Sequence, residues 1–278
     1  MSRRSLGRFR WLVLALALAA LAAPAVAQTD PQPASTSGTA ASRDTGPAGR
    51  LFLGFEREAV LVNRQWWEGQ IEIAQGDVID VQQARLVVAM NPFRGMEFGG
   101  RIGFGSTDTD SGLPDGRGAT DLDLWAKFAL GRFEGGTHVV AGALLTLPTG
   151  DNTAGLGDDA FSGGGFLAIR RPIGRMTLHA DFGIRSYQDG EILGFKQDGR
   201  TTGFVGGGLV IPMDRSFDFI AEARYESEKF RDRDADSRVL GGIDWRLTDN
   251  GRLRAAVGFG VTDGAPDFQF IAGWAGMF

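Results

Sequence analysis

A period of two in hydrophobicity is the feature that most restricts how this chain can fold. In residues 176–185, apolar side chains alternate with polar ones, and a β-strand would place each set on its own face. About a dozen stretches share this pattern, and the charged side chains mostly keep to one of the two faces. The simplest fold with this property is an all-β, transmembrane antiparallel up-and-down β-barrel of about 12 strands, apolar outside and polar inside.

Eleven of the predicted strands follow the alternation, and each has close to the ~9–11 residues that a tilted membrane strand requires. This assignment predicts an outward face without charged side chains, because a lipid-facing Arg or Lys at mid-depth costs ~2–4 kcal/mol. The predicted strands are residues 79–90, 96–105, 120–130, 137–147, 161–170, 176–185, 201–211, 217–226, 238–247, 253–261 and 268–278.

The first strand is the least regular, and we expect it at residues 51–62. Trp66 and Trp67 then fall in a loop, where packing over the barrel rim is favoured over stacking against a ligand. The later connections alternate between short turns and longer polar loops, as in outer-membrane barrels, whose short turns face the periplasm. Short turns are expected at residues 91–95, 131–136, 171–175, 212–216 and 248–252.

The first 27 residues have the composition of a cleaved secretory signal peptide. Four arginines precede an apolar run, and small residues stand before Gln28. Residues 28–49 are rich in Pro, Ser, Thr and Ala, so we expect a flexible periplasmic leader, with a plug of the lumen as the alternative. The barrel is assigned to residues 50–278, and the predicted location is the cell outer membrane after signal cleavage.

Composition excludes several other classes of protein. Without the four arginines of the signal peptide, the chain has 25 basic residues against 34 acidic ones, which argues against nucleic acid as a partner. There is no cysteine, so no disulfide framework is available. Glycine is frequent, at 42 of 278 residues, and lies mainly within the alternating runs, where a closed, sheared sheet needs bends and close packing.

The polar faces of the predicted strands define a candidate pore. Acids and bases are nearly balanced there, which predicts mutual pairing, and twelve strands predict a narrow, partly occluded lumen. A purely structural ladder of charges is the alternative. The candidate lumen-lining residues are Arg85, Glu97, Arg101, Asp121, Asp123, Lys127, His138, His179, Asp181, Arg185, Asp218, Glu222, Arg224, Arg238, Asp244, Arg246, Arg252 and Arg254.

Two other kinds of site are weaker hypotheses. An outer-membrane hydrolase acting on lipids or esters would need a serine beside an oriented histidine, and Asp181 could orient His179, but no serine stands in a recognisable motif. The aspartates at 108, 110, 115 and 121 invite a calcium site, although their spacing misses the calcium-loop pattern and a solvated loop is favoured. We therefore expect no enzyme activity, no metal and no cofactor.

Two short motifs carry a family resemblance. The sequence LPTGD at residues 147–151, followed by GLG at 155–157, and GAPD at 264–267 together resemble the outer-membrane barrel family named for the MetA pathway of phenol degradation. The resemblance implies a transporter of small molecules, such as aromatic or hydrophobic compounds. Expected partners are outer-membrane lipid, the barrel-assembly machinery and a small-molecule solute. Trp274 and Phe278 form the expected assembly signal, although barrel-assembly signals usually have an aromatic residue at the antepenultimate position, which is Gly276 here.

Overall fold

The computed structural model describes residues 50–61, 65–77, 79–109 and 115–277. The predicted signal peptide, the predicted leader and Phe278 lie outside these residues. Within the described part of the chain, no helix is long and apolar enough to cross a membrane.

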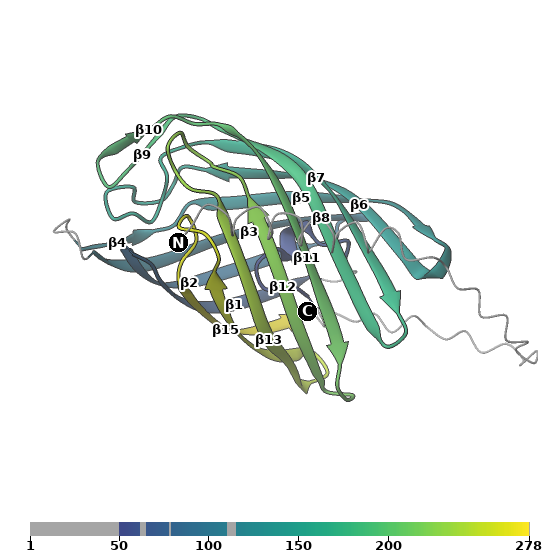
Figure 1. Cartoon of the computed structure of the whole chain (residues 1–278). Coiled ribbons are helices and arrows are strands. Elements are labelled where there is room, and N and C mark those ends of the chain that lie inside the picture. The colour runs from purple at the N-terminus through teal and green to yellow at the C-terminus, as the bar shows by residue number, and fades with distance from the viewer. Residues whose placement is uncertain (1–49, 62–64, 78, 110–114, 278) are drawn as a thin grey trace, which may run out of the picture.

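The described residues form a closed antiparallel β-barrel with a wall of twelve strands (Figure 1). Closure comes from β1, which pairs with β2 on one side and with β15, the last strand, on the other. Two segments, β4 and β5, pair in turn with β3 and act as one wall strand. The wall strands are β1 (Trp66–Gln75), β2 (Ile79–Met90), β3 (Met96–Thr109), β4 (Gly116–Ala119) with β5 (Leu122–Phe133), β6 (Thr137–Leu147), β7 (Ser162–Ile173), β8 (Met176–Tyr187), β11 (Thr201–Pro212), β12 (Phe217–Glu226), β13 (Asp236–Thr248), β14 (Gly251–Gly260) and β15 (Phe268–Met277).

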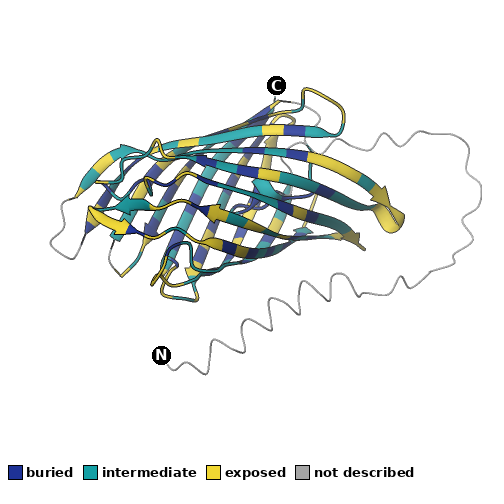
Figure 2. Cartoon of the chain, turned by 90° about the horizontal axis from the view of Figure 1, so that it is seen from above, coloured by how far each residue is buried: buried dark blue, intermediate teal, exposed yellow. Residues whose placement is uncertain are grey.

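The predicted alternation is visible as alternating burial along the strands (Figure 2). Large apolar side chains such as Ile71, Phe104 and Ile184 are 59%, 62% and 64% exposed and point outward. The prediction of an outward face without charged side chains is wrong. Asp80 and Arg171 share it, but both lie close to a strand end, where a charge in the polar boundary region costs little.

The observed strand bounds agree most closely with the predicted ones where apolar and polar residues alternate clearly. The strands at Ile79–Met90, Thr137–Leu147 and Phe217–Glu226 have the predicted bounds, and most others run a few residues further than predicted. The loop predicted at residues 187–200 contains a small hairpin, β9 (Gly190–Ile192) and β10 (Phe195–Gln197).

The predicted first strand is wrong. Residues 50–61 form no strand but lie inside the barrel, with one turn of 3-10 helix, η1 (Phe55–Arg57), and we call them the lumen segment (Figure 1). Three consecutive charged residues, 56–58, cannot be sorted onto the two faces of a strand, which is the physical reason for the error. The first strand is β1, and Trp66 is completely buried within it rather than lying in a loop.

The lumen is also less polar than predicted, because inward-facing apolar side chains receive the lumen segment. Phe55 packs with Trp66 and Trp125, at ring centroid distances of 6.0 and 5.5 Å. A second cluster forms around Leu51 and Phe52 of the segment. The barrel interior therefore contains a hydrophobic core that is built jointly by the wall and by the segment.

The LPTGD and GLG motifs fold the loop after β6 against the start of β5. The backbone N–H of Asp151 donates to the Ala119 carbonyl at 3.0 Å, and that of Gly150 donates to the Asp121 carboxylate at 2.8 Å. A Cβ on Gly150 would lie 2.8 Å from the Cα of Gly157, so both motifs need glycine for this close approach. The motifs thus have a structural role at the long-loop end of the barrel.

Candidate solute pathway

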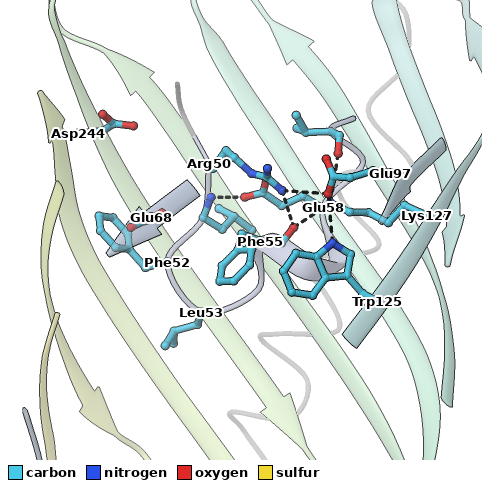
Figure 3. Close-up of polar contacts among 12 residues, drawn as sticks. Arg50, Phe52, Leu53, Phe55, Glu58, Glu68, Glu97, Trp125, Lys127 and Asp244 are labelled. Atoms are coloured by element: carbon cyan, nitrogen blue, oxygen red, sulfur yellow. Dashed lines mark hydrogen bonds and ion pairs between the residues drawn. The ribbon is translucent and has the colours of Figure 1, made fainter. Parts of the chain in front are cut away.

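One cluster of charges holds the lumen segment against β3 and β5 (Figure 3). The Lys127 ammonium donates to the carbonyl oxygens of Phe55 and Val60, at 3.0 and 3.2 Å, and lies 2.7 Å from the Glu97 carboxylate. Arg50 of the segment reaches the same Glu97 oxygen at 3.7 Å and pairs with Glu58 at 3.3 Å. All four charged side chains are fully buried, so each depends on these partners to offset its desolvation.

A second cluster holds the beginning of the segment against β12 and β14. The Glu222 carboxylate accepts hydrogen bonds from the backbone N–H groups of Phe52 and Leu53, at 2.9 and 3.1 Å. Arg254 donates to the carbonyl oxygen of Leu51 at 3.1 Å and pairs with Glu68 of β1 at 2.7 Å. The predicted lumen residues Lys127, Glu222 and Arg254 therefore bind backbone of the lumen segment rather than facing an open pore.

Other predicted lumen residues pair with one another, as the near balance of charge predicted. Arg224 contacts Glu222 at 2.8 Å and Asp181 at 3.4 Å, and Asp181 also lies 3.4 Å from Arg57 of the segment. Towards the short-turn end of the barrel, Arg252 lies 2.7 Å from Asp244, whose other carboxylate oxygen is 3.7 Å from Arg254.

Closer to the long-loop end, the pairs are less buried. Arg101 Nε donates to Asp123 at 3.0 Å, and Arg185 Nε donates to the Ser162 hydroxyl at 2.9 Å. Arg85 lies 2.6 Å from Glu72, and Arg238 pairs with Asp236. These guanidinium groups stay partly accessible, with 19–24% of each side chain exposed.

Four of the predicted lumen residues lie outside these clusters. Asp121 sits between β4 and β5, where it holds the loop after β6 through the N–H groups of Gly150 and Asp158. Arg246 is exposed at the short-turn end. His138 is half-buried at the same end, in register with Arg132 and Arg170. Asp218 is half-buried and 3.4 Å from Arg252. Among the residues that the structure describes, none of these four makes a hydrogen bond or ion pair with the lumen segment.

Sequence reasoning missed the charged residues of β1 and of the lumen segment. Glu68, Gln70 and Glu72 alternate with apolar residues in β1, so the same period of two could have identified this strand. Arg50 and Glu58 carry no periodic signal, because their positions are set by contacts with strands that lie far along the chain.

A cavity of about 240 Å³ lies on the long-loop side of the segment. Its lining combines apolar side chains of the segment, Phe52 and Leu53, with inward-facing charges of the wall. A neighbouring cavity of about 300 Å³ extends towards the loop after β6 and shares part of this lining. We call the two cavities the vestibule, and the charged residues common to both are Arg85, Arg101, Asp123, Arg185 and Lys229.

The two alternative kinds of site find no support in the geometry of the described residues. His179 is 2% exposed, and neither of its ring nitrogens has a hydrogen-bond partner, so Asp181 does not orient it for catalysis. For the calcium hypothesis, no group of three potential metal ligands occurs among the described residues, and Asp110 lies outside them. Asp115 accepts a hydrogen bond from the N–H of Thr109 at 3.2 Å.

Solved structures with the same fold are outer-membrane channels and porins. The COG4313 outer membrane channel from Pseudomonas putida F1 superimposes with a TM-score of 0.66 at 12% identity, over 82% of this chain and 100% of that one. The NanC porin gives 0.54 at 10% identity, over 76% and 100% of the two chains, and the KdgM porin gives 0.53 at 12%, over 77% and 99%. No protein-family model matches the sequence, and no curated protein is similar enough to be matched. The likeness therefore establishes the outer-membrane barrel fold.

Proposed function

We propose that this protein is an outer-membrane channel for small molecules that combine an apolar part with a charged or hydrogen-bonding group. The observation that carries this proposal is the lining of the vestibule. Guanidinium groups, which bind carboxylates through two parallel hydrogen bonds, stand there opposite the apolar side chains of the lumen segment. The accessible lining is mainly polar with a smaller apolar part, so it suits a solute that carries both kinds of group.

This solute class connects two features that otherwise point in different directions. The charged lumen favours polar solutes, whereas the resemblance to the MetA-pathway family suggests aromatic or hydrophobic ones. An aromatic carboxylate satisfies both, with its ring against Phe52 or Leu53 and its carboxylate at Arg101 or Arg185. The KdgM porin has been solved in complex with disordered oligogalacturonate, whose sugar units carry carboxylates. This complex supports the idea that a barrel of this fold can hold solutes with a carboxylate.

The placement in the cell belongs to the same proposal. Signal cleavage after Ala27, insertion by the barrel-assembly machinery and an assembly signal at Trp274 and Phe278 would bring the barrel to the outer membrane. The short turns would then face the periplasm and the vestibule would face the exterior. The lumen segment lies between them and must shift, at least locally, for a solute to pass.

Uptake into proteoliposomes tests the proposal, with benzoate, benzyl alcohol and glucose as solutes. Benzoate should enter fastest relative to its rate in protein-free vesicles. In Arg101→Gln, Asp123 loses its closest cationic partner and the vestibule gains a net negative charge. Benzoate entry should fall about tenfold, which corresponds to ~1.4 kcal/mol, while glucose entry stays unchanged.

The matched control is Arg200→Gln, which removes an exposed arginine that pairs with Glu228 outside the vestibule. An equal loss of benzoate entry in both variants would contradict the role of the vestibule. If the parent protein passes none of the three solutes faster than empty vesicles do, the channel proposal fails and a purely structural barrel is favoured.

A further inference from the structure

Four of the five short turns carry an exposed arginine next to an exposed apolar side chain. Phe93, Phe133 and Met213 are 65%, 59% and 61% exposed, and Met176 is 37% exposed. We call the four arginines the arginine collar, and they are Arg94 beside Phe93, Arg132 beside Phe133, Arg175 beside Met176, and Arg215 in the turn with Met213.

Within the described part of the chain, none of the four collar guanidinium groups makes an ion pair or a side-chain hydrogen bond. The nearby acid Asp214 is occupied by its own turn, because its carboxylate accepts the N–H groups of Ser216 and Phe217 at 2.6 and 2.9 Å. The guanidinium groups are therefore free to bind a ligand from outside.

Two loops at the opposite end of the barrel have the opposite charge. The loops at residues 148–161 and 261–267 contain five aspartates and no basic residue, whereas Arg117, Arg200, Arg231 and Arg233 lie elsewhere at that end. Of these four, Arg200 and Arg231 have the ion-pair partners Glu228 and Asp198, and Arg233 donates to Gln197. Exposed arginines without such a partner are thus concentrated at the short-turn end. The collar also continues onto the wall, because Arg171 points outward beside the exposed side chain of Ile173, just before the turn that holds Arg175.

We propose that the arginine collar binds the phosphate groups of anionic phospholipids in the leaflet that surrounds the short-turn end. The neighbouring apolar side chains would lie at the level where the acyl chains begin, as interfacial anchors do. A guanidinium group next to such an anchor can reach the phosphate, which it binds with two hydrogen bonds. This inference rests on the membrane placement proposed above, but not on transport.

The partner is a phospholipid rather than a soluble anion, because each arginine is paired with an exposed apolar side chain. A soluble acidic protein would need no such set of apolar groups at four of the five short turns. An arginine near an anionic membrane surface contributes ~1 kcal/mol, so removing one should weaken lipid binding at its turn about fivefold.

The test compares two variants that each lose four exposed arginines. The collar variant carries Gln at Arg94, Arg132, Arg175 and Arg215, and the loop variant carries Gln at Arg117, Arg200, Arg231 and Arg233. Both are purified as folded barrels, verified by heat-modifiable migration in a gel, and titrated with phosphatidylglycerol or phosphatidylcholine in detergent. Native mass spectrometry counts the lipids that stay bound.

The parent protein and the loop variant should retain phosphatidylglycerol in preference to phosphatidylcholine, and the collar variant should lose that preference. Equal loss in both variants would mean that net charge alone attracts the lipid, and would overturn the proposal. A parent protein without any preference would overturn it as well. Failure of solute transport would leave this result unaffected, so the two proposals can fail separately.

Discussion

Replacing Glu222 with Gln should release the lumen segment from the wall. The carboxylate accepts backbone N–H groups of Phe52 and Leu53 at 2.9 and 3.1 Å and pairs with Arg224. The Glu222 oxygen that lies 2.9 Å from the Phe52 nitrogen also lies 3.2 Å from the Leu53 nitrogen, so an amide that places its single oxygen there keeps both contacts. Hydrogen bonds to a charged group contribute ~1.5–3 kcal/mol and neutral ones ~0.5–1.5, so each of the two contacts loses about 1 kcal/mol. A total of about 2 kcal/mol raises the population with a displaced segment about 30-fold.

Thiol labelling measures that population directly. The natural chain has no cysteine, so Ala59→Cys introduces a single thiol within the lumen segment, at a position that is 2% exposed. When opening and closing are fast relative to modification, the labelling rate follows the open population. It should rise about 30-fold when Glu222→Gln is added, and single-channel conductance in a planar bilayer should rise in parallel.

The matched control is Asp218→Asn, the same chemical change on the same strand. Asp218 contacts Arg252 at 3.4 Å and makes no polar contact with the segment. Its labelling rate should stay within about twofold of the parent rate, since no charge-assisted bond to the segment is lost. Equal rates in the parent, Glu222→Gln and Asp218→Asn would refute the idea that these two hydrogen bonds hold the segment in place.

Three further outcomes are expected. Gly164→Val should reduce the heat-modifiable barrel fraction on a gel, because a Cβ there lies 2.3 Å from the Ile184 carbonyl oxygen, whereas Gly203→Ala, with nothing within 4 Å, should assemble normally. Deleting Phe278 should lower the amount of assembled barrel while signal cleavage continues; normal assembly would remove its role as a signal. Hydrogen bonds, chiefly from the Thr153 hydroxyl, lower the pKa of Asp151 below its ordinary value of 3.8. These bonds therefore stabilise the loop at pH values above 3.8, and the stabilisation is lost as the pH falls through the lowered pKa. Thr153→Val should raise that pKa in an NMR titration, and an unchanged pKa would contradict the assigned cause.

The wall could be predicted from the sequence because its information is local. Along β12, each residue's face follows from its parity, and Asp218, Glu222 and Arg224 indeed share one face. The same rule could have found β1, where Glu68 alternates with apolar neighbours, but the apolar run at residues 51–55 resembled a strand more closely.

The contents of the barrel could not be predicted in the same way. Inward apolar residues such as Val87, Val140 and Phe166 contradict a polar lumen until a segment is present to cover them. That segment is specified by contacts with distant strands and has no period of its own. Charge balance predicted pairing between charged side chains in the lumen. It could not show that Lys127 and Glu222 also bind backbone groups of the lumen segment.

The joining of β1 to β15 has a consequence for the order of folding. Contacts of the lumen segment span 170 residues from Phe52 to Glu222 and 203 from Leu51 to Arg254. Contacts of such long range form late, because the entropy of closing the intervening chain must be overcome first. The beginning of the segment becomes fully ordered only when the C-terminal strands are in place, so a chain stalled before β14 would expose Leu51 and Phe52, whose apolar cluster includes Ala256 and Ile271. Completion of the wall and burial of these N-terminal apolar residues are therefore one coupled step, and a chaperone that binds apolar segments would bind unfinished barrels and leave finished ones.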